Sequence, residues 1–197
     1  MTQELKLELQ RFALQIRIGI LEQLKARGFG HIGGSLSVAD ALAVLYGSVM
    51  RVDAENSTRE ARDKLVCSKG HAGPAVYAAL ALKGFFPYDE LKTLNQPGTR
   101  LPSHCDRNKT PGVDMTTGSL GLGISAACGM ALGAKLAGKD FRVFTVLGDG
   151  EIQEGQVWEA AMYASAKGLD NLVAMVRFRK DRFGRQPCSP RQSSSQI

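Results

Sequence analysis

Apolar residues recur at helical spacing along the first part of the chain. In residues 4–27 they return every three or four positions, and Gly28 follows where a helix would end. A second helix is expected to open at Ser37, because Asp40 three residues later completes a capping box. A third is expected over residues 74–83, where a glycine again follows. The glycine-rich segment GFGHIGGS between the first two helices is expected to be a loop.

Three short apolar runs have the pattern of buried strands. They cover residues 65–68, 141–147 and 171–176. A Gly- and Ala-rich segment over residues 119–138 is expected to be a buried helix, and another helix is expected within residues 148–168. Because right-handed strand–helix–strand crossovers join parallel neighbours, this order predicts strands of one parallel sheet. The predicted fold class is therefore α/β.

The composition of the chain changes at Arg177. The net charge is +6, and residues 177–197 hold six basic side chains against one acidic, with no Leu, Val or Ala. We predict one domain over residues 1–176, followed by a basic, Ser/Gln-rich tail that is disordered and adds little to a core. A basic tail without interleaved aromatic residues does not indicate nucleic-acid binding.

The cysteines and the apolar runs point to a cytoplasmic protein. The four cysteines are widely spaced with no C-x-x-C pair, so neither a zinc site nor a disulfide framework is expected. No uninterrupted apolar run reaches the length of about 18 residues that a membrane span needs. The N-terminus reads as a charged amphipathic helix, so we expect neither a membrane span nor a secretory signal.

The tripeptide Gly148-Asp149-Gly150 directly follows the strand expected at residues 141–147. In open α/β sheets, ligands lie outside the carboxyl ends of strands, where backbone N–H groups hold phosphate. A carboxylate beside phosphate requires a bridging cation, so Asp149 is a candidate ligand of magnesium or calcium. Gly150 would allow a close approach of the backbone. For the tripeptide alone, a tight turn with a solvated or capping Asp149 is the favoured interpretation.

The three histidines all lie in glycine- or proline-rich connections. His31 lies in FGHIGGS, His71 in SKGHAGP, and His104 in LPSHCD. The last of these belongs to residues 86–117, whose four prolines predict a long ordered loop, and such loops are usually functional. The distribution suggests phosphate or hydroxyl recognition, whereas for any one histidine alone a satisfied polar residue is the favoured interpretation. No two have the spacing of a zinc site.

The segment GSLGLG, from Gly118 to Gly123, differs from a dinucleotide-binding fingerprint. Its glycines are ordered G-x-x-G-x-G and follow a loop rather than a strand. They would instead let a flat ring or another backbone come close to this turn.

Taken together, four segments resemble the N-terminal half of transketolase, in the form made as a separate subunit. They are GHIGGSLSVADALAVLYG, SKGHAGP, HCDRNKTPGVDMTTGSLG and GDGEIQEGQVWEAAMYASAKGLDNL, and the resemblance covers roughly residues 5–176. It implies the thiamine-diphosphate-binding fold, a parallel sheet with helices on both faces, incomplete at the C-terminus.

The resemblance also implies roles for individual residues. Asp149 would bind the metal, and Gly150 and His71 would contact the diphosphate. Gly118 and Leu120 would contact the thiamine ring through their backbone. His31 and His104 would contact the ketose, and Glu154 would belong to a carboxylate network at the subunit interface.

The implied activity is the reversible transfer of a two-carbon ketol unit from a ketose phosphate to an aldose phosphate, with thiamine diphosphate and Mg²⁺ or Ca²⁺ as cofactors. In this family the cofactor lies between two chains, and the activating glutamate belongs to the pyrimidine-binding domain, which this sequence does not contain. Both a C-terminal partner chain and a hetero-oligomer are therefore expected.

One departure from the family pattern concerns the metal. The second metal ligand is normally an asparagine in a segment resembling V-D-x-N, where this chain reads Val176-Arg177-Phe178-Arg179. An arginine offers no lone pair to a cation, so Arg179 cannot replace that ligand. We therefore expect impaired metal and cofactor binding, and we take a truncated or frame-shifted gene as a hypothesis. The alternatives are a non-catalytic chain that only pairs with a partner, or another thiamine-diphosphate enzyme such as a deoxyxylulose-phosphate synthase or a ketoacid dehydrogenase component.

Overall fold

The computed structural model describes residues 1–55 and 62–177. Its helices are α1 (Gln3–Arg27), α2 (Ile32–Leu36), α3 (Ala39–Val44), α4 (Gly73–Leu82), α5 (Leu122–Leu136) and α6 (Gly155–Ala166), with a π-helical turn η1 (Leu45–Val49) and 3-10 turns η2 (Gly70–Ala72), η3 (Tyr88–Thr93) and η4 (Glu151–Gln153). Its strands are β1 (Lys64–Cys67), β2 (Val143–Gly148) and β3 (Leu172–Arg177).

The three strands form one parallel sheet in the order β1-β2-β3. Lys64 pairs with Val143, and Val143 in turn pairs with Leu172. The predicted α/β class and parallel sheet are confirmed, and each predicted strand lies within two residues of an observed one. Because all strands run the same way, their carboxyl ends lie along one edge of the sheet.

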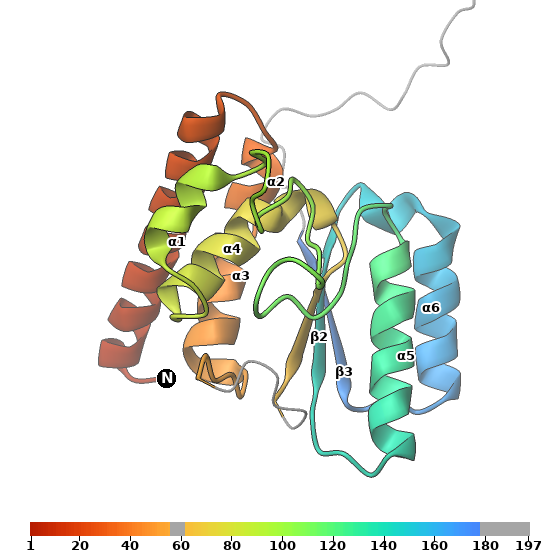
Figure 1. Ribbon diagram of the computed structural model, residues 1–197. Helices are drawn as coiled ribbons and strands as arrows, with labels where there is room; N and C mark the ends of the chain where they lie inside the picture. The colour runs from red at the N-terminus through yellow and green to blue at the C-terminus, as the bar shows by residue number, and fades with distance from the viewer. Residues whose placement is uncertain (56–61, 178–197) are drawn as a thin grey trace, which may run out of the picture.

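Helices cover both faces of the sheet (Figure 1). On one face, Leu65 and Phe144 share a buried core with residues of α1, α3 and α4, and on the other, Val66 and Val143 share a core with residues of α5 and α6. Neighbouring residues of β1 and β2 therefore enter different cores, as the period of two along a strand requires. Because both faces of β1 and β2 are buried, the loops that follow these strands lie together at the carboxyl edge of the sheet.

The first helix follows its sequence pattern closely. Thr2 caps its N-terminus by accepting from the Leu5 backbone N–H, and Gly28 ends it with φ 86° while donating to Leu24 O. Only glycine adopts this left-handed conformation without steric cost. The predicted stop at Gly28 is confirmed.

The capping box predicted at Ser37 is wrong. The chain is already helical from Ile32, and α3 begins only at Ala39, after Val38, without a side-chain cap. The Ser37 hydroxyl instead donates to Gly34 O at 2.8 Å. The Ser37 side chain therefore bonds to the helical turn that precedes it, in α2, and not to the first turn of α3.

The stretch Ile32–Val49 is long and apolar enough, by length and composition, to cross a membrane, with a mean hydropathy of 1.4. It is divided among α2, α3 and η1, and Val38, Leu42 and Tyr46 from it lie in the core beside α1. The core helix of a soluble protein has the same composition. The stretch therefore gives only weak evidence about membranes.

Candidate functional site

A cavity of about 250 Å³ opens at the carboxyl ends of β1 and β2. Four of the residues singled out in the sequence line it together: His71, Leu120, Asp149 and Gly150. They come from η2, from the turn before α5 and from the turn after β2. The structure thus brings Gly150 and His71 to the same cavity, although they are 79 positions apart in the sequence.

The three histidines form one cluster. The ring centroids of His31 and His71 lie 5.1 Å apart, and those of His31 and His104 lie 5.9 Å apart. Burial and the neighbouring His31 lower the pKa of His71, and the same two causes lower that of His104. Both imidazoles are therefore neutral near pH 7, and each offers one donor and one acceptor nitrogen.

Gly34 makes room for this cluster. A Cβ added at Gly34 would lie 2.7 Å from Cδ2 of His71. Such a contact is too short for real side chains, so any larger residue would displace the imidazole. A glycine in α2 is thus required by a ring that the turn η2 contributes.

Two basic side chains face the cavity besides the predicted residues. Lys69 Nζ donates to Gly34 O at 2.9 Å and to Ser37 Oγ at 2.8 Å, and burial lowers the pKa of this lysine. Arg177, expected to begin the tail, is the last residue of β3, and its Nε donates to Ser37 O at 2.8 Å. Both cations were missed because the contacts that place them join distant segments. The remainder of the predicted tail, 178–197, lies outside the described residues.

Glu151 is the functional residue that sequence reasoning missed most clearly. Its side chain is 1% exposed, and its carboxylate accepts from the Ser68 hydroxyl and, at 3.0 Å each, from the backbone N–H groups of Gly121 and Gly148. It therefore ties together the ends of β1 and β2 and the turn before α5. Only its place directly after Gly150 hinted at this role.

The turn before α5 packs against the end of β1. Gly121 has φ 84°, and a Cβ added at Gly123 would lie 2.5 Å from Cα of Ser68. The expectation that these glycines admit another backbone is confirmed. Gly118 lies in the same turn, where an added Cβ would be 3.9 Å from Cδ2 of His104.

Glu154 lies apart from the cavity. It is exposed at the start of α6, and a Cβ added at Gly121 would be 3.0 Å from its own Cβ. Within the described parts of the chain its carboxylate accepts no hydrogen bond. Its predicted role at a subunit interface stays a prediction.

The residues around the cavity fit a diphosphate. Lys69 and Arg177 supply positive charge, and the Gly150 turn supplies backbone close to open space. In the described ranges no three His, Cys, Asp or Glu side chains gather in a metal-binding group. Magnesium is nevertheless often held by one or two carboxylates together with phosphate oxygens and water, so Asp149 suits a cation bridged to a diphosphate. Arg179 lies outside the described residues.

Comparison with known proteins agrees with this geometry. The sequence pattern of the family described as "Transketolase, thiamine diphosphate binding domain" matches residues 9–179. The chain belongs to the transketolase family. Over 177 residues it is 53% identical to a 6-deoxy-6-sulfo-D-fructose transketolase subunit of Clostridium sp. (strain MSTE9), covering 90% of this chain and 64% of the relative. Over 147 residues it is 42% identical to an apulose-4-phosphate transketolase subunit of Phocaeicola vulgatus, covering 75% and 52%.

The fold also matches a solved structure of the family. The transketolase of Campylobacter jejuni superposes with a TM-score of 0.81 at 31% identity, over 89% of this chain and 28% of that one. The chain thus spans less than two thirds of the length of these relatives. The predicted thiamine-diphosphate-binding fold is confirmed.

Proposed function

We propose that the chain is the thiamine-diphosphate-binding subunit of a two-subunit transketolase, which transfers a two-carbon ketol unit from a ketose to an aldose. The observation that carries this proposal is the cavity in which Asp149, His71 and Lys69 converge beside the histidine cluster. The transketolase subunits among its relatives support it.

The cavity residues would hold the diphosphate end of the cofactor. The Lys69 ammonium and the Arg177 guanidinium would offset its negative charge, and Asp149 would supply a carboxylate ligand to Mg²⁺ or Ca²⁺. His71 and the Gly150 backbone are placed to contact the same group, and Gly118 and Leu120 lie in the turn assigned to the thiamine ring. Thiamine diphosphate, when bound, supplies the electron sink that cleavage of a carbon–carbon bond requires.

His31 and His104 would bind the hydroxyl groups of the ketose. Their ring centroids lie 5.9 Å apart in an edge-to-face arrangement, and His31 lines a second cavity that also contacts His71. A neutral imidazole can accept a proton from a hydroxyl with one nitrogen and donate with the other, which suits a reaction that moves protons between substrate oxygens.

A C-terminal transketolase subunit would complete the site. Apolar side chains are exposed along α6 and the start of α5, with Leu122 56% exposed, Trp158 59% and Met162 66%. They lie near Glu154, the residue assigned to the subunit interface. An apolar surface of this kind is typical of a protein–protein interface. This surface supports a hetero-oligomer as the assembly, and the cytoplasmic location stays a prediction.

For the donor we propose a ketose with an anionic group on its terminal carbon. One relative is described as acting with 6-deoxy-6-sulfo-D-fructose and another with apulose 4-phosphate. Both compounds are sugars with a charged end, so sulfosugars and sugar phosphates are the substrate classes to test.

Reconstitution tests the proposal. The full chain is mixed with a C-terminal transketolase subunit, Mg²⁺ and thiamine diphosphate, and ketol transfer and cofactor affinity are measured. We expect transfer only when both chains and the cofactor are present. Asp149→Asn should weaken cofactor affinity by more than the roughly 10-fold that loss of an outer-shell partner costs. The matched control Asp89→Asn alters a carboxylate that is 87% exposed on η3 and should change nothing. A paired complex that binds no thiamine diphosphate would refute the proposal.

A further inference from the structure

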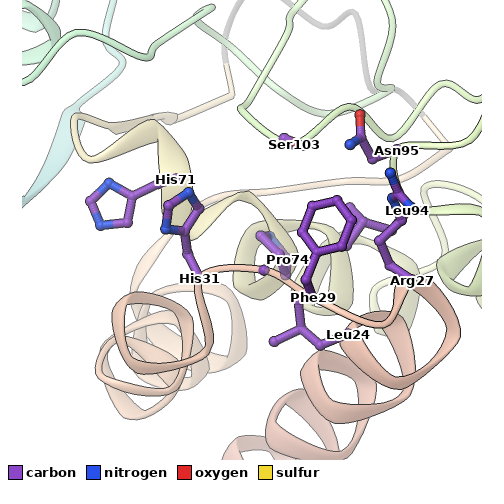
Figure 2. A pocket seen from close by; sticks show the side chains of 10 residues that line it. Leu24, Arg27, Phe29, His31, His71, Pro74, Leu94, Asn95 and Ser103 are labelled. Atoms are coloured by element: carbon purple, nitrogen blue, oxygen red, sulfur yellow. The ribbon is translucent and has the colours of Figure 1, made fainter.

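The segment 102–104 carries His104 into the histidine cluster. Its middle residue, Ser103, borders the second cavity, of about 230 Å³, together with His31 and His71, whose rings lie side by side in Figure 2. The His104 side chain is exposed, and within residues 1–55 and 62–177 its imidazole makes no hydrogen bond. The position of this ring is therefore set by the backbone that carries it.

Tyr77, on α4, holds that backbone. Its hydroxyl donates to Pro102 O at 2.8 Å and to His104 O at 3.0 Å, so its one hydrogen is shared between the two carbonyls. In the part of the chain that the structure describes, these are the two hydrogen bonds that residues 102–104 form. Because the segment belongs to no helix or strand, its path depends on the phenol.

The phenol is itself fixed by close packing. Tyr77 is 0% exposed and shares a core with Leu101 and Cys105, which flank the segment. A Cβ added at Gly73, one turn earlier on α4, would lie 3.2 Å from the Tyr77 hydroxyl oxygen and 3.3 Å from Ser103 O. Burial raises the pKa of Tyr77 well above its usual range, so the hydroxyl keeps its hydrogen and remains a donor. A fixed donor thus meets two carbonyls of a loop that has no other hydrogen bonds in the described chain.

We propose that Tyr77 is a positioning residue, which fixes the backbone of residues 102–104 and so holds the His104 imidazole beside that of His31 for contact with the ketose. The inference rests on the proposed function, in which His104 binds a hydroxyl group of the ketose. Tyr77 is not among the described residues that line the cavity beside Asp149, so it acts on the ketose and not on the cofactor. A displacement of about 1 Å caused far from the reacting atoms can lower a rate by about 100-fold.

The test variant is Tyr77→Phe, which removes the hydroxyl and keeps the buried ring. Its control is Tyr46→Phe, because Tyr46 is a second buried tyrosine of the same core and makes no hydrogen bond to the segment within the described residues. Both are measured in the complex of the full chain with its C-terminal partner.

Three quantities are followed in that complex. Calorimetry gives the Kd of thiamine diphosphate, and ketol transfer from 6-deoxy-6-sulfo-D-fructose gives KM and kcat. Because this chain contains three histidines, labelling it alone with ¹³C-histidine gives three imidazole resonances, of which His104→Gln identifies that of His104.

We expect Tyr77→Phe to lower kcat/KM for the ketose by about 10- to 100-fold, while the Kd of thiamine diphosphate changes by less than about 2-fold. The His104 resonance should move. The pKa of His104, which burial and His31 lower, should rise toward its ordinary 6.5. Tyr46→Phe should change none of these quantities.

The double variant Tyr77→Phe/His104→Gln separates positioning from a general structural role. If Tyr77 acts through His104, the double variant should lose no more ketose activity than His104→Gln alone. Additive losses would overturn the inference, as would an equal loss of cofactor affinity or an unmoved His104 resonance in Tyr77→Phe. A His104 resonance that moves, in a complex whose wild type shows no ketol transfer, would count against the proposed function alone.

Discussion

Replacing Glu151 by glutamine tests how the site is held together. The carboxylate is buried, and it accepts from Ser68 and Gly121 through Oε1 and from the Gly148 N–H through Oε2. Glutamine has nearly the same shape, but one of its ends is an NH₂ group that cannot accept. If its oxygen takes the place of Oε1, the NH₂ group faces the Gly148 N–H. One charge-assisted bond is then lost and two become neutral.

The structure sets the size of this effect. A hydrogen bond to a charged group contributes about 1.5–3 kcal/mol, and removing the buried charge relieves part of its desolvation cost. We therefore expect Glu151→Gln to lower the free energy of unfolding by about 2 kcal/mol, equivalent to roughly 4–8 °C in Tm for a chain of this size. Because Gly148 directly precedes Asp149, cofactor affinity should also fall by about 10-fold, which corresponds to about 1.4 kcal/mol.

Urea unfolding of the full chain and calorimetry of thiamine diphosphate with the chain–partner complex measure the two effects. Glu8→Gln, an exposed carboxylate on α1, is the matched control and should stay within about 0.5 kcal/mol of wild type. If Glu151→Gln also stayed within that margin, the carboxylate would not be what joins the three loops.

Three further predictions concern residues near or below the site. Gly34→Ala should displace the His71 ring and cost about 1–3 kcal/mol, visible as a shifted imidazole resonance and a lower urea midpoint. The pKa of His71 should lie below its ordinary 6.5 in an NMR titration, so the stability gained from its neutral form is present above that pH and is lost as the pH falls through the lowered pKa. Asp114→Asn should destabilise the chain by about 3 kcal/mol, because its carboxylate pairs at 2.7 Å with the buried Arg62 guanidinium; an unchanged urea midpoint would contradict this.

The sequence revealed the parts of the structure that depend on local pattern. The strands predicted from short apolar runs pair in parallel. A helix joins β2 to β3, and a crossover of this kind connects parallel strands of one sheet. The rule that ligands lie at the carboxyl ends of strands placed Asp149 correctly beside His71. Gly28 was readable as a helix stop because its signal lies within one turn of α1.

The features that were missed depend on contacts between distant segments. Ser37 has the sequence of a helix cap, but the Lys69 ammonium and the Arg177 guanidinium bond to its hydroxyl and carbonyl, 32 and 140 positions away. Glu151 resembles an exposed first-turn glutamate, and its partner Ser68 is 83 positions earlier. The pattern of residues in a short stretch of sequence cannot predict such bonds, because it does not show which loops lie next to each other in the fold.

The glycines of the site explain why its loops can meet at all. A Cβ at Gly70 would collide with the Thr117 carbonyl oxygen, and one at Gly123 would lie 2.5 Å from Cα of Ser68. The end of β1 is therefore in backbone contact with both the long loop and the turn before α5, and no side chain fits between them. Loops packed this closely can shift only together. The donors around Glu151 and His71 are thus fixed before any ligand arrives, and binding a diphosphate there needs little further ordering of the chain.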